Sequence, residues 1–256
     1  MATDQSIQDL LAAGYAAIAD AGFQTGDFAP ARELLGQAQE QAASAADTVS
    51  LASALNGLAM VAHHENLMLL IGGGVPADSE IAAEEQLFRR ALAEGQQSGD
   101  AACTAHSLFG LGLVFQVLRQ DWMTAMPFYW QALGLVTAPG SDVGRYLRSE
   151  VHRHVGFYFA VEDVQPREAV RHLQISLDLR EELGDPRYIA SGLLALGEAE
   201  LSAGNPDRAV ELLTKAVDLA RAEKLLPHRL EDAERALRDA RAARDPAADG
   251  GSGADG

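Results

Sequence analysis

The chain has 256 residues, of which 48% are hydrophobic and 22% charged, so it is long enough to bury a substantial core. Its formal net charge is −17, whereas nucleic-acid binding normally needs a basic face that displaces counterions, so nucleic acid is not expected as a partner. Cys103 is the one cysteine of the sequence, which excludes an intrachain disulfide and a cysteine-based zinc cluster.

The first residues predict no targeting segment. Met1–Asp4 lack the basic and apolar regions of a signal peptide, and no apolar run approaches the roughly 20 residues that span a bilayer. We therefore expect a cytoplasmic protein with no membrane association. Only Lys215 and Lys224 are lysines, and this arginine bias with abundant alanine indicates a bacterial genome of high GC content.

The elements expected in chain order are five helical hairpins of about forty residues, a final helix and a tail. Residues 197–221, GEAELSAGNPDRAVELLTKAVDLAR, show the hairpin most clearly: one helix ends near Gly204 and another begins at Pro206. Proline suits a first helical turn because its missing N–H would be unpaired there. The five predicted repeats are 5–45, 46–97, 98–140, 141–184 and 185–223.

Small and large apolar residues recur at fixed positions in these hairpins. In the fifth repeat the spacing is Leu193-x2-Leu196-Gly197, then Ala209-x3-Leu213. Equivalent sets are Leu108, Leu111, Gly112, Ala125 and Tyr129; His152, Val155, Gly156, Ala169 and Leu173; Tyr15, Ile18, Ala19, Ala31 and Leu35; and, least regular, Leu55, Leu58, Ala59, Glu84 and Phe88. This spacing resembles the tetratricopeptide repeat, although the family repeat has 34 residues. The resemblance implies an all-α solenoid that binds partners in a concave groove.

Aspartate and glycine mark the junctions between the predicted repeats. Asp47, Asp100, Asp142 and Asp185 each precede a first helix, and Gly99 and Gly184 precede two of these aspartates. Glycine suits a helix C-terminus and aspartate caps the next N-terminus, because the two helix ends leave opposite backbone groups unpaired.

The last predicted helix, 226–244, carries one apolar stripe on an otherwise charged surface. A stripe of this kind is typical of the helix that caps a solenoid, so residues 1–244 are predicted to form one domain. The acidic, glycine-rich residues 245–256 have no apolar anchor and are expected to be disordered.

In repeats of this type, first helices line the groove, and the resemblance therefore implies which side chains face it. The predicted ligand-binding residues are Asn56, Met60, His63, His106, Phe109, Leu113, Gln116, Glu150, Arg153, Phe157 and Glu198. An apolar lining with a few convergent polar groups is the usual composition of a binding pocket. Arg153, Glu150 and His106 are predicted to form its polar centre.

Catalytic and metal sites are not predicted. His63-His64-Glu65 lacks the further histidine of a zinc-protease helix, and a His106–Glu150 pair supplies too few ligands for zinc. Gly72–Gly74 interrupts the second repeat and indicates a connector between its helices, with a lid over the groove as the alternative. We expect no cofactor and no catalytic residue.

The function predicted from these patterns is a protein- or peptide-binding module with a regulatory or scaffolding role. Two alternatives remain: a small-molecule sensor or unusual enzyme with a closed pocket around His106, Glu150 and Arg153, and a scaffold that self-associates into a homo-oligomer.

Overall fold

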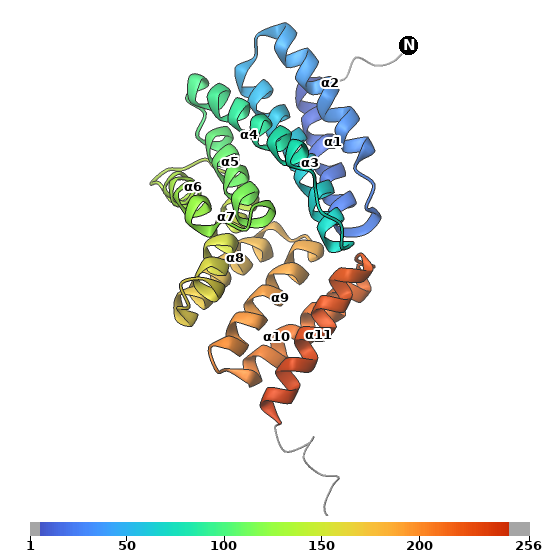
Figure 1. Cartoon of the computed structure of the whole chain (residues 1–256), viewed down its shortest axis with the longest axis vertical. Coiled ribbons are helices and arrows are strands. Elements are labelled where there is room, and N and C mark those ends of the chain that lie inside the picture. The colour runs from blue at the N-terminus through green and yellow to red at the C-terminus, as the bar shows by residue number, and fades with distance from the viewer. Residues whose placement is uncertain (1–5, 246–256) are drawn as a thin grey trace, which may run out of the picture. The chain divides into compact units, whose positions relative to one another are not determined.

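The structure is a computed structural model that describes residues 6–245. Within that range all regular structure is helical (Figure 1). The helices are α1 (Ile7–Asp20), α2 (Ala29–Ala45), α3 (Thr48–Ile71), α4 (Asp78–Ser98), α5 (Ala101–Leu113), α6 (Trp122–Val136), α7 (Arg145–Val161), α8 (Pro166–Leu183), α9 (Pro186–Ser202), α10 (Pro206–Ala222) and α11 (Pro227–Arg244). One π-helical turn, Ala21–Thr25, extends α1, and another, Val114–Leu118, extends α5. Apart from Asp245, the predicted tail 245–256 lies outside the described residues.

The chain divides into two compact units, with the boundary inside α7 between Leu147 and Arg148. In unit 1, before this boundary, each helix from α1 to α6 packs against the next, and the first helices α1, α3 and α5 also contact one another in order. In unit 2, after it, α8 to α11 pack in succession and α9 also contacts α11. Helix pairs that stack through their neighbours are the arrangement of an all-α solenoid, and the predicted fold class is confirmed.

Glycine allows the two helices of a hairpin to approach closely. A Cβ on Gly197 of α9 would lie 2.6 Å from Leu213 Cγ of α10, and one on Gly112 of α5 would lie 2.4 Å from Tyr129 Cε1 of α6. Real Cβ atoms do not come that near to other heavy atoms. The small residue of the repeat pattern is therefore required by the large one that packs over it.

Three of the four predicted aspartates cap first helices. Asp47, Asp100 and Asp185 each accept a hydrogen bond from a backbone N–H in the following turn. Asp142 does not occupy this position, because α7 begins three residues later, at Arg145. Gly99 and Gly184 end their helices with φ of 72° and 75°, in the left-handed region where glycine is unstrained.

One apolar stretch is longer than the sequence analysis expected. Ala101–Leu118, which joins α5 to its π-helical turn, is long and apolar enough to cross a membrane by length and composition, with a mean hydropathy of 1.6. More than half of it, 56%, is buried inside the protein, and α5 contacts α3, α4 and α6. These contacts are those of a core helix, which is apolar for the same reason.

Candidate functional site

Five of the seven predicted groove residues in unit 1 lie in its interior. The exposed fractions are 0% for Asn56, 6% for Met60, 3% for His63, 3% for Phe109 and 3% for Leu113. The expectation that these side chains face a ligand is corrected by their burial. The physical reason is that α3 and α5 contact each other as well as their own second helices, so little of their surface remains for a groove.

Asn56 joins the first helices of two successive repeats. Its amide Nδ2 donates to the Cys103 carbonyl at 3.1 Å, and its Oδ1 lies 2.8 Å from the Ser107 hydroxyl. Both partners belong to α5, and Ser107 is fully buried. An amide that satisfies its hydrogen-bonding groups inside the protein is a structural residue, because leaving either group unpaired would cost free energy.

His63 belongs to a buried polar cluster with Glu84 and Asn66. His63 Nδ1 lies 2.8 Å from Glu84 Oε1, and Asn66 donates to Glu84 Oε2 at 2.9 Å. Glu84 has no exposed surface and Asn66 is 7% exposed. The cluster connects α3 to α4, and it satisfies both oxygens of the carboxylate at the core of the hairpin.

The other two unit 1 residues, His106 and Gln116, are partly buried. The His106 ring lies 5.8 Å from the ring of Tyr15, and burial lowers the pKa of His106 to about 4. Gln116 accepts a hydrogen bond from the Tyr129 hydroxyl. His106 is therefore neutral at physiological pH and does not present a cation to a ligand.

In unit 2, Glu150 is held by an arginine that the sequence analysis did not single out. Arg180 of α8 is 1% exposed and forms an ion pair with Glu150 of α7, which is 8% exposed. Arg180 Nη1 also donates to the Tyr188 carbonyl at 2.9 Å. Glu150 thus neutralises a buried guanidinium, and the predicted small-molecule pocket loses its carboxylate to this role.

Arg153, Phe157 and Glu198 are the predicted residues of unit 2 that keep accessible surface. The Arg153 guanidinium carbon lies 4.6 Å from the centre of the Phe157 ring, and its Nη1 lies 3.9 Å from Glu150 Oε2. The Arg153 side chain is 25% exposed. Stacking on an aromatic face and a nearby carboxylate both orient the guanidinium while leaving part of it available to solvent.

Glu198 lies on α9, which contacts α11. Desolvation raises the pKa of its carboxyl, and the cations of Arg235 and Arg153 act in the opposite direction. Glu198 therefore shares an electrostatic environment with Arg153, and the two supply opposite charges on first helices of unit 2.

Glu84 and Arg180, whose buried pairing was not predicted, occupy unusual positions in the repeat pattern. Glu84 stands where the repeat pattern has a small residue, and Arg180 completes the stripe Leu173, Ser176, Leu177. A charged residue in line with packed apolar ones has no solvent to face, so it indicates a buried partner on a neighbouring helix.

Two histidines lie close together in unit 2. The Nδ1 atoms of His152 and His172 are 3.1 Å apart, and burial lowers the pKa of His152 to about 4. Burial also lowers the pKa of His172. Within residues 6–245 no three His, Cys, Asp or Glu side chains gather closely enough to hold a metal ion. The pair therefore belongs to the packing of α7 against α8.

Comparison with curated proteins identifies one similar sequence of regulatory character. The chain is 35% identical over 129 residues to response regulator aspartate phosphatase A of Bacillus subtilis (strain 168). The aligned part is 48% of this chain and 32% of that relative, so the chain spans about a third of the relative's length. No family model matches the chain.

Among solved structures, the crystal structure of BtubC (BKLC) from P. vanneervenii is similar over 99% of this chain and 96% of that chain. The sequence identity is 15% and the TM-score is 0.44. A score at that level does not by itself establish a common fold.

Proposed function

We propose that the chain is a tetratricopeptide-type regulatory module that binds a protein or peptide segment on the first helices of unit 2. The observation that carries this proposal is the 129-residue similarity to a protein named for its action on response regulators. Such similarity favours a cytoplasmic bacterial protein that recognises another protein. Response regulators are accordingly the first class of partner to test.

The accessible groups on α7 and α9 support peptide recognition. Arg153 offers a guanidinium held in place by Phe157, and Glu198 offers a carboxylate on the next first helix. Together they can pair with both charges of an extended peptide, while the partly exposed Phe157 ring can contact an apolar side chain. The Glu150–Arg180 ion pair fixes α7 against α8 beneath this surface.

The experiment is selection of peptides from a random twelve-residue display library, followed by measurement of Kd by fluorescence polarisation. For the selected peptides we expect Arg153→Ala and Glu198→Gln each to weaken binding by about tenfold, a change of about 1.4 kcal/mol. The matched control is Arg171→Ala, which removes an exposed arginine of α8 whose one ion pair within residues 6–245 is with Glu168 of its own helix. The control is expected to bind within twofold of the wild type.

Equal binding by all three variants would place the peptide elsewhere on the molecule and overturn the assignment of this surface. A second measurement tests the partner class, by titrating purified response regulators from the same host in their phosphorylated and unphosphorylated forms. Saturable binding that depends on Arg153 supports a response regulator as the partner. Absence of binding to every response regulator, with peptide binding retained, restricts the proposal to peptides.

A further inference from the structure

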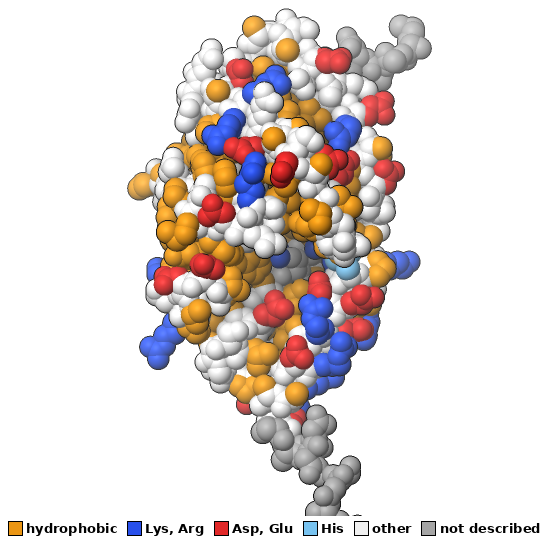
Figure 2. Space-filling model, viewed as in Figure 1, with side chains coloured by type: hydrophobic (Ala, Val, Ile, Leu, Met, Phe, Trp, Pro, Cys, Tyr) orange, Lys and Arg blue, Asp and Glu red, His pale blue; other side chains and the backbone are white. Residues whose placement is uncertain are grey.

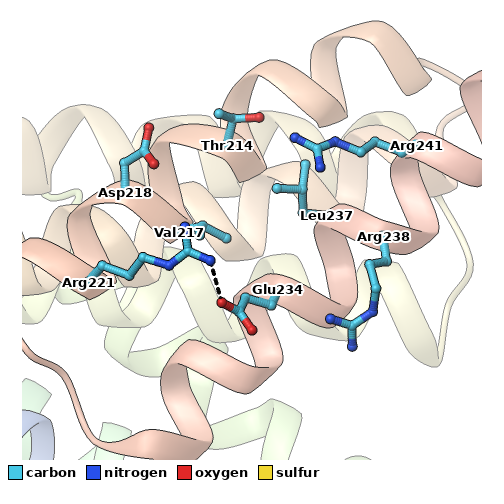
Figure 3. A pocket seen from close by; sticks show the side chains of 8 residues that line it. All are labelled: Thr214, Val217, Asp218, Arg221, Glu234, Leu237, Arg238 and Arg241. Carbon is cyan, nitrogen blue, oxygen red and sulfur yellow. Dashed lines mark hydrogen bonds and ion pairs between the residues drawn. The ribbon is translucent and has the colours of Figure 1, made fainter.

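A cleft between α10 and α11 gathers arginines on a strongly acidic chain. It has a volume of about 310 Å³ and lies in unit 2 (Figure 3). Arg221 of α10 and Arg238 and Arg241 of α11 line it. The buried side chains of Val217 and Leu237 also contribute to its lining. None of the groove residues predicted from the sequence takes part in this cleft.

Arg221 is already neutralised inside the cleft. It donates to Glu234 of α11 at 2.6 Å, and the dashed line in Figure 3 marks this contact. The remaining carboxylate in the lining is Asp218. The cleft therefore holds three guanidinium groups against two carboxylates, which is the reverse of the balance in the whole chain, with its net charge of −17.

Arg238 and Arg241 differ from the other arginines in the second half of α11. Arg235, Arg238, Arg241 and Arg244 recur every three residues. The outer two form ion pairs, Arg235 with Asp232 and Arg244 with Asp245, each at 2.7 Å. Neither of the two middle side chains forms an ion pair or hydrogen bond with any described residue, and among these four arginines they are the two that line the cleft. Figure 2 shows the basic side chains gathered over α11.

From this arrangement we propose that the α10–α11 cleft is a binding site for a small oxyanion ligand, one that bears phosphate or carboxylate groups. Guanidinium groups bind both kinds of oxyanion through paired N–H donors. Arg238 and Arg241, whose side chains pair with no other described residue, point to different sides of Leu237 in Figure 3, and each can supply such donors to a ligand in the cleft. The apolar Val217 and Leu237 side chains give a contact for the carbon skeleton of such a ligand. The site is separate from the peptide surface proposed above, because it lies on α10 and α11.

The test is calorimetric titration of the full-length protein with inorganic pyrophosphate at low ionic strength, with succinate as a second probe. We expect saturable 1:1 binding of pyrophosphate that weakens as salt is added. The double variant Arg238→Gln/Arg241→Gln is expected to weaken binding at least tenfold. The double variant Arg238→Lys/Arg241→Lys keeps the positive charges but loses the paired N–H donors. Its affinity for pyrophosphate is expected to lie between those of the Gln double variant and the wild type.

The matched control is Arg235→Gln/Arg244→Gln, which also removes two positive charges from α11, but from residues outside the cleft lining. It is expected to bind within threefold of the wild type. Equal weakening in the two Gln double variants would show that net charge alone attracts the probe and would overturn the site, as would titration without saturation. If succinate binds as tightly as pyrophosphate, the site accepts carboxylates; if only pyrophosphate binds, the ligand carries phosphate.

Discussion

Replacement of Arg180 by methionine is expected to destabilise unit 2 strongly, although methionine has a similar length. The guanidinium is 1% exposed, forms an ion pair with Glu150 and donates to the Tyr188 carbonyl. Its removal leaves a carboxylate that is 8% exposed without its principal cation, and leaves that carbonyl without this donor. Removal of one member of a buried pair typically costs about 3–5 kcal/mol.

The expected loss lies at the lower end of this range, about 3 kcal/mol, because Arg153 remains 3.9 Å from Glu150. The double variant Glu150→Leu/Arg180→Met removes both charges and their desolvation cost. Its free energy of unfolding is expected within about 1 kcal/mol of the wild type. Arg180 Nε, which has no hydrogen-bond partner among the described residues, makes the native pair less favourable than its geometry suggests and supports this expectation.

The assay is urea unfolding followed by far-UV circular dichroism, with the slope of the transition checked for each variant. The matched control is Arg208→Met, because Arg208 and Glu211 form an exposed pair whose side chains are 45% and 50% accessible. The control is expected to leave the midpoint unchanged. The reasoning is refuted if Arg180→Met loses less than about 1 kcal/mol, or if the double variant is less stable than Arg180→Met.

Three further predictions concern packing, protonation and capping. Gly197→Ala places a Cβ 2.6 Å from Leu213 Cγ and should lower the free energy of unfolding by about 1–3 kcal/mol. Gly36→Ala, whose new Cβ would have nothing within 4 Å, should raise the free energy of unfolding by up to about 1 kcal/mol. Urea unfolding that shows changes of the same sign in both variants contradicts the close approach of Gly197 to Leu213. The pKa of His152 is about 4 in the folded protein and about 6.5 in the unfolded chain. The contribution of neutral His152 to the free energy of unfolding is therefore complete above pH 6.5 and is lost as the pH falls toward 4. Unfolding free energies measured from pH 7.5 to 4.5 should therefore decline more steeply in the wild type than in His152→Gln, and parallel curves would contradict this. Asp185→Ala removes the hydrogen bond accepted from Arg187 N at 2.9 Å and should lower the free energy of unfolding by about 1 kcal/mol at pH 7. Because Arg187 lowers the pKa of Asp185, the difference in stability between wild type and variant should vanish as the pH falls through that pKa. A difference in stability that persists in acid would exclude the capping carboxylate as its cause.

The helical hairpins could be predicted from the sequence because their determinants are local. Pro206, Gly204 and the Gly197–Leu213 spacing each specify a turn or a close contact within about twenty residues. Capping by Asp47 and Asp185 follows from the same short-range chemistry. Asp142 resembles them in sequence but lies three residues before α7, since nothing local fixes how long the preceding loop runs.

The exposure of the predicted site residues could not be predicted from local sequence patterns. A position on a first helix predicts the direction of a side chain only if the neighbouring first helix leaves room beside it. In unit 1, α3 packs against both α1 and α5, and Asn56 and His63 are enclosed. Long-range packing of this kind is absent from the repeat pattern, which records only contacts between consecutive helices.

The buried polar residues share one arrangement, which bears on where ligands bind. Asn56 connects α3 to α5, Glu84 connects α4 to α3, and Arg180 connects α8 to α7 while donating to the Tyr188 carbonyl. Each satisfies a specific neighbour, so a helix in the wrong place would leave a buried charge or amide unpaired, at a cost that apolar contacts alone would not impose. Polar groups used in this way are not available to a ligand. Arg238 and Arg241, whose side chains pair with no other described residue, are therefore the groups whose replacement should alter binding with little effect on stability.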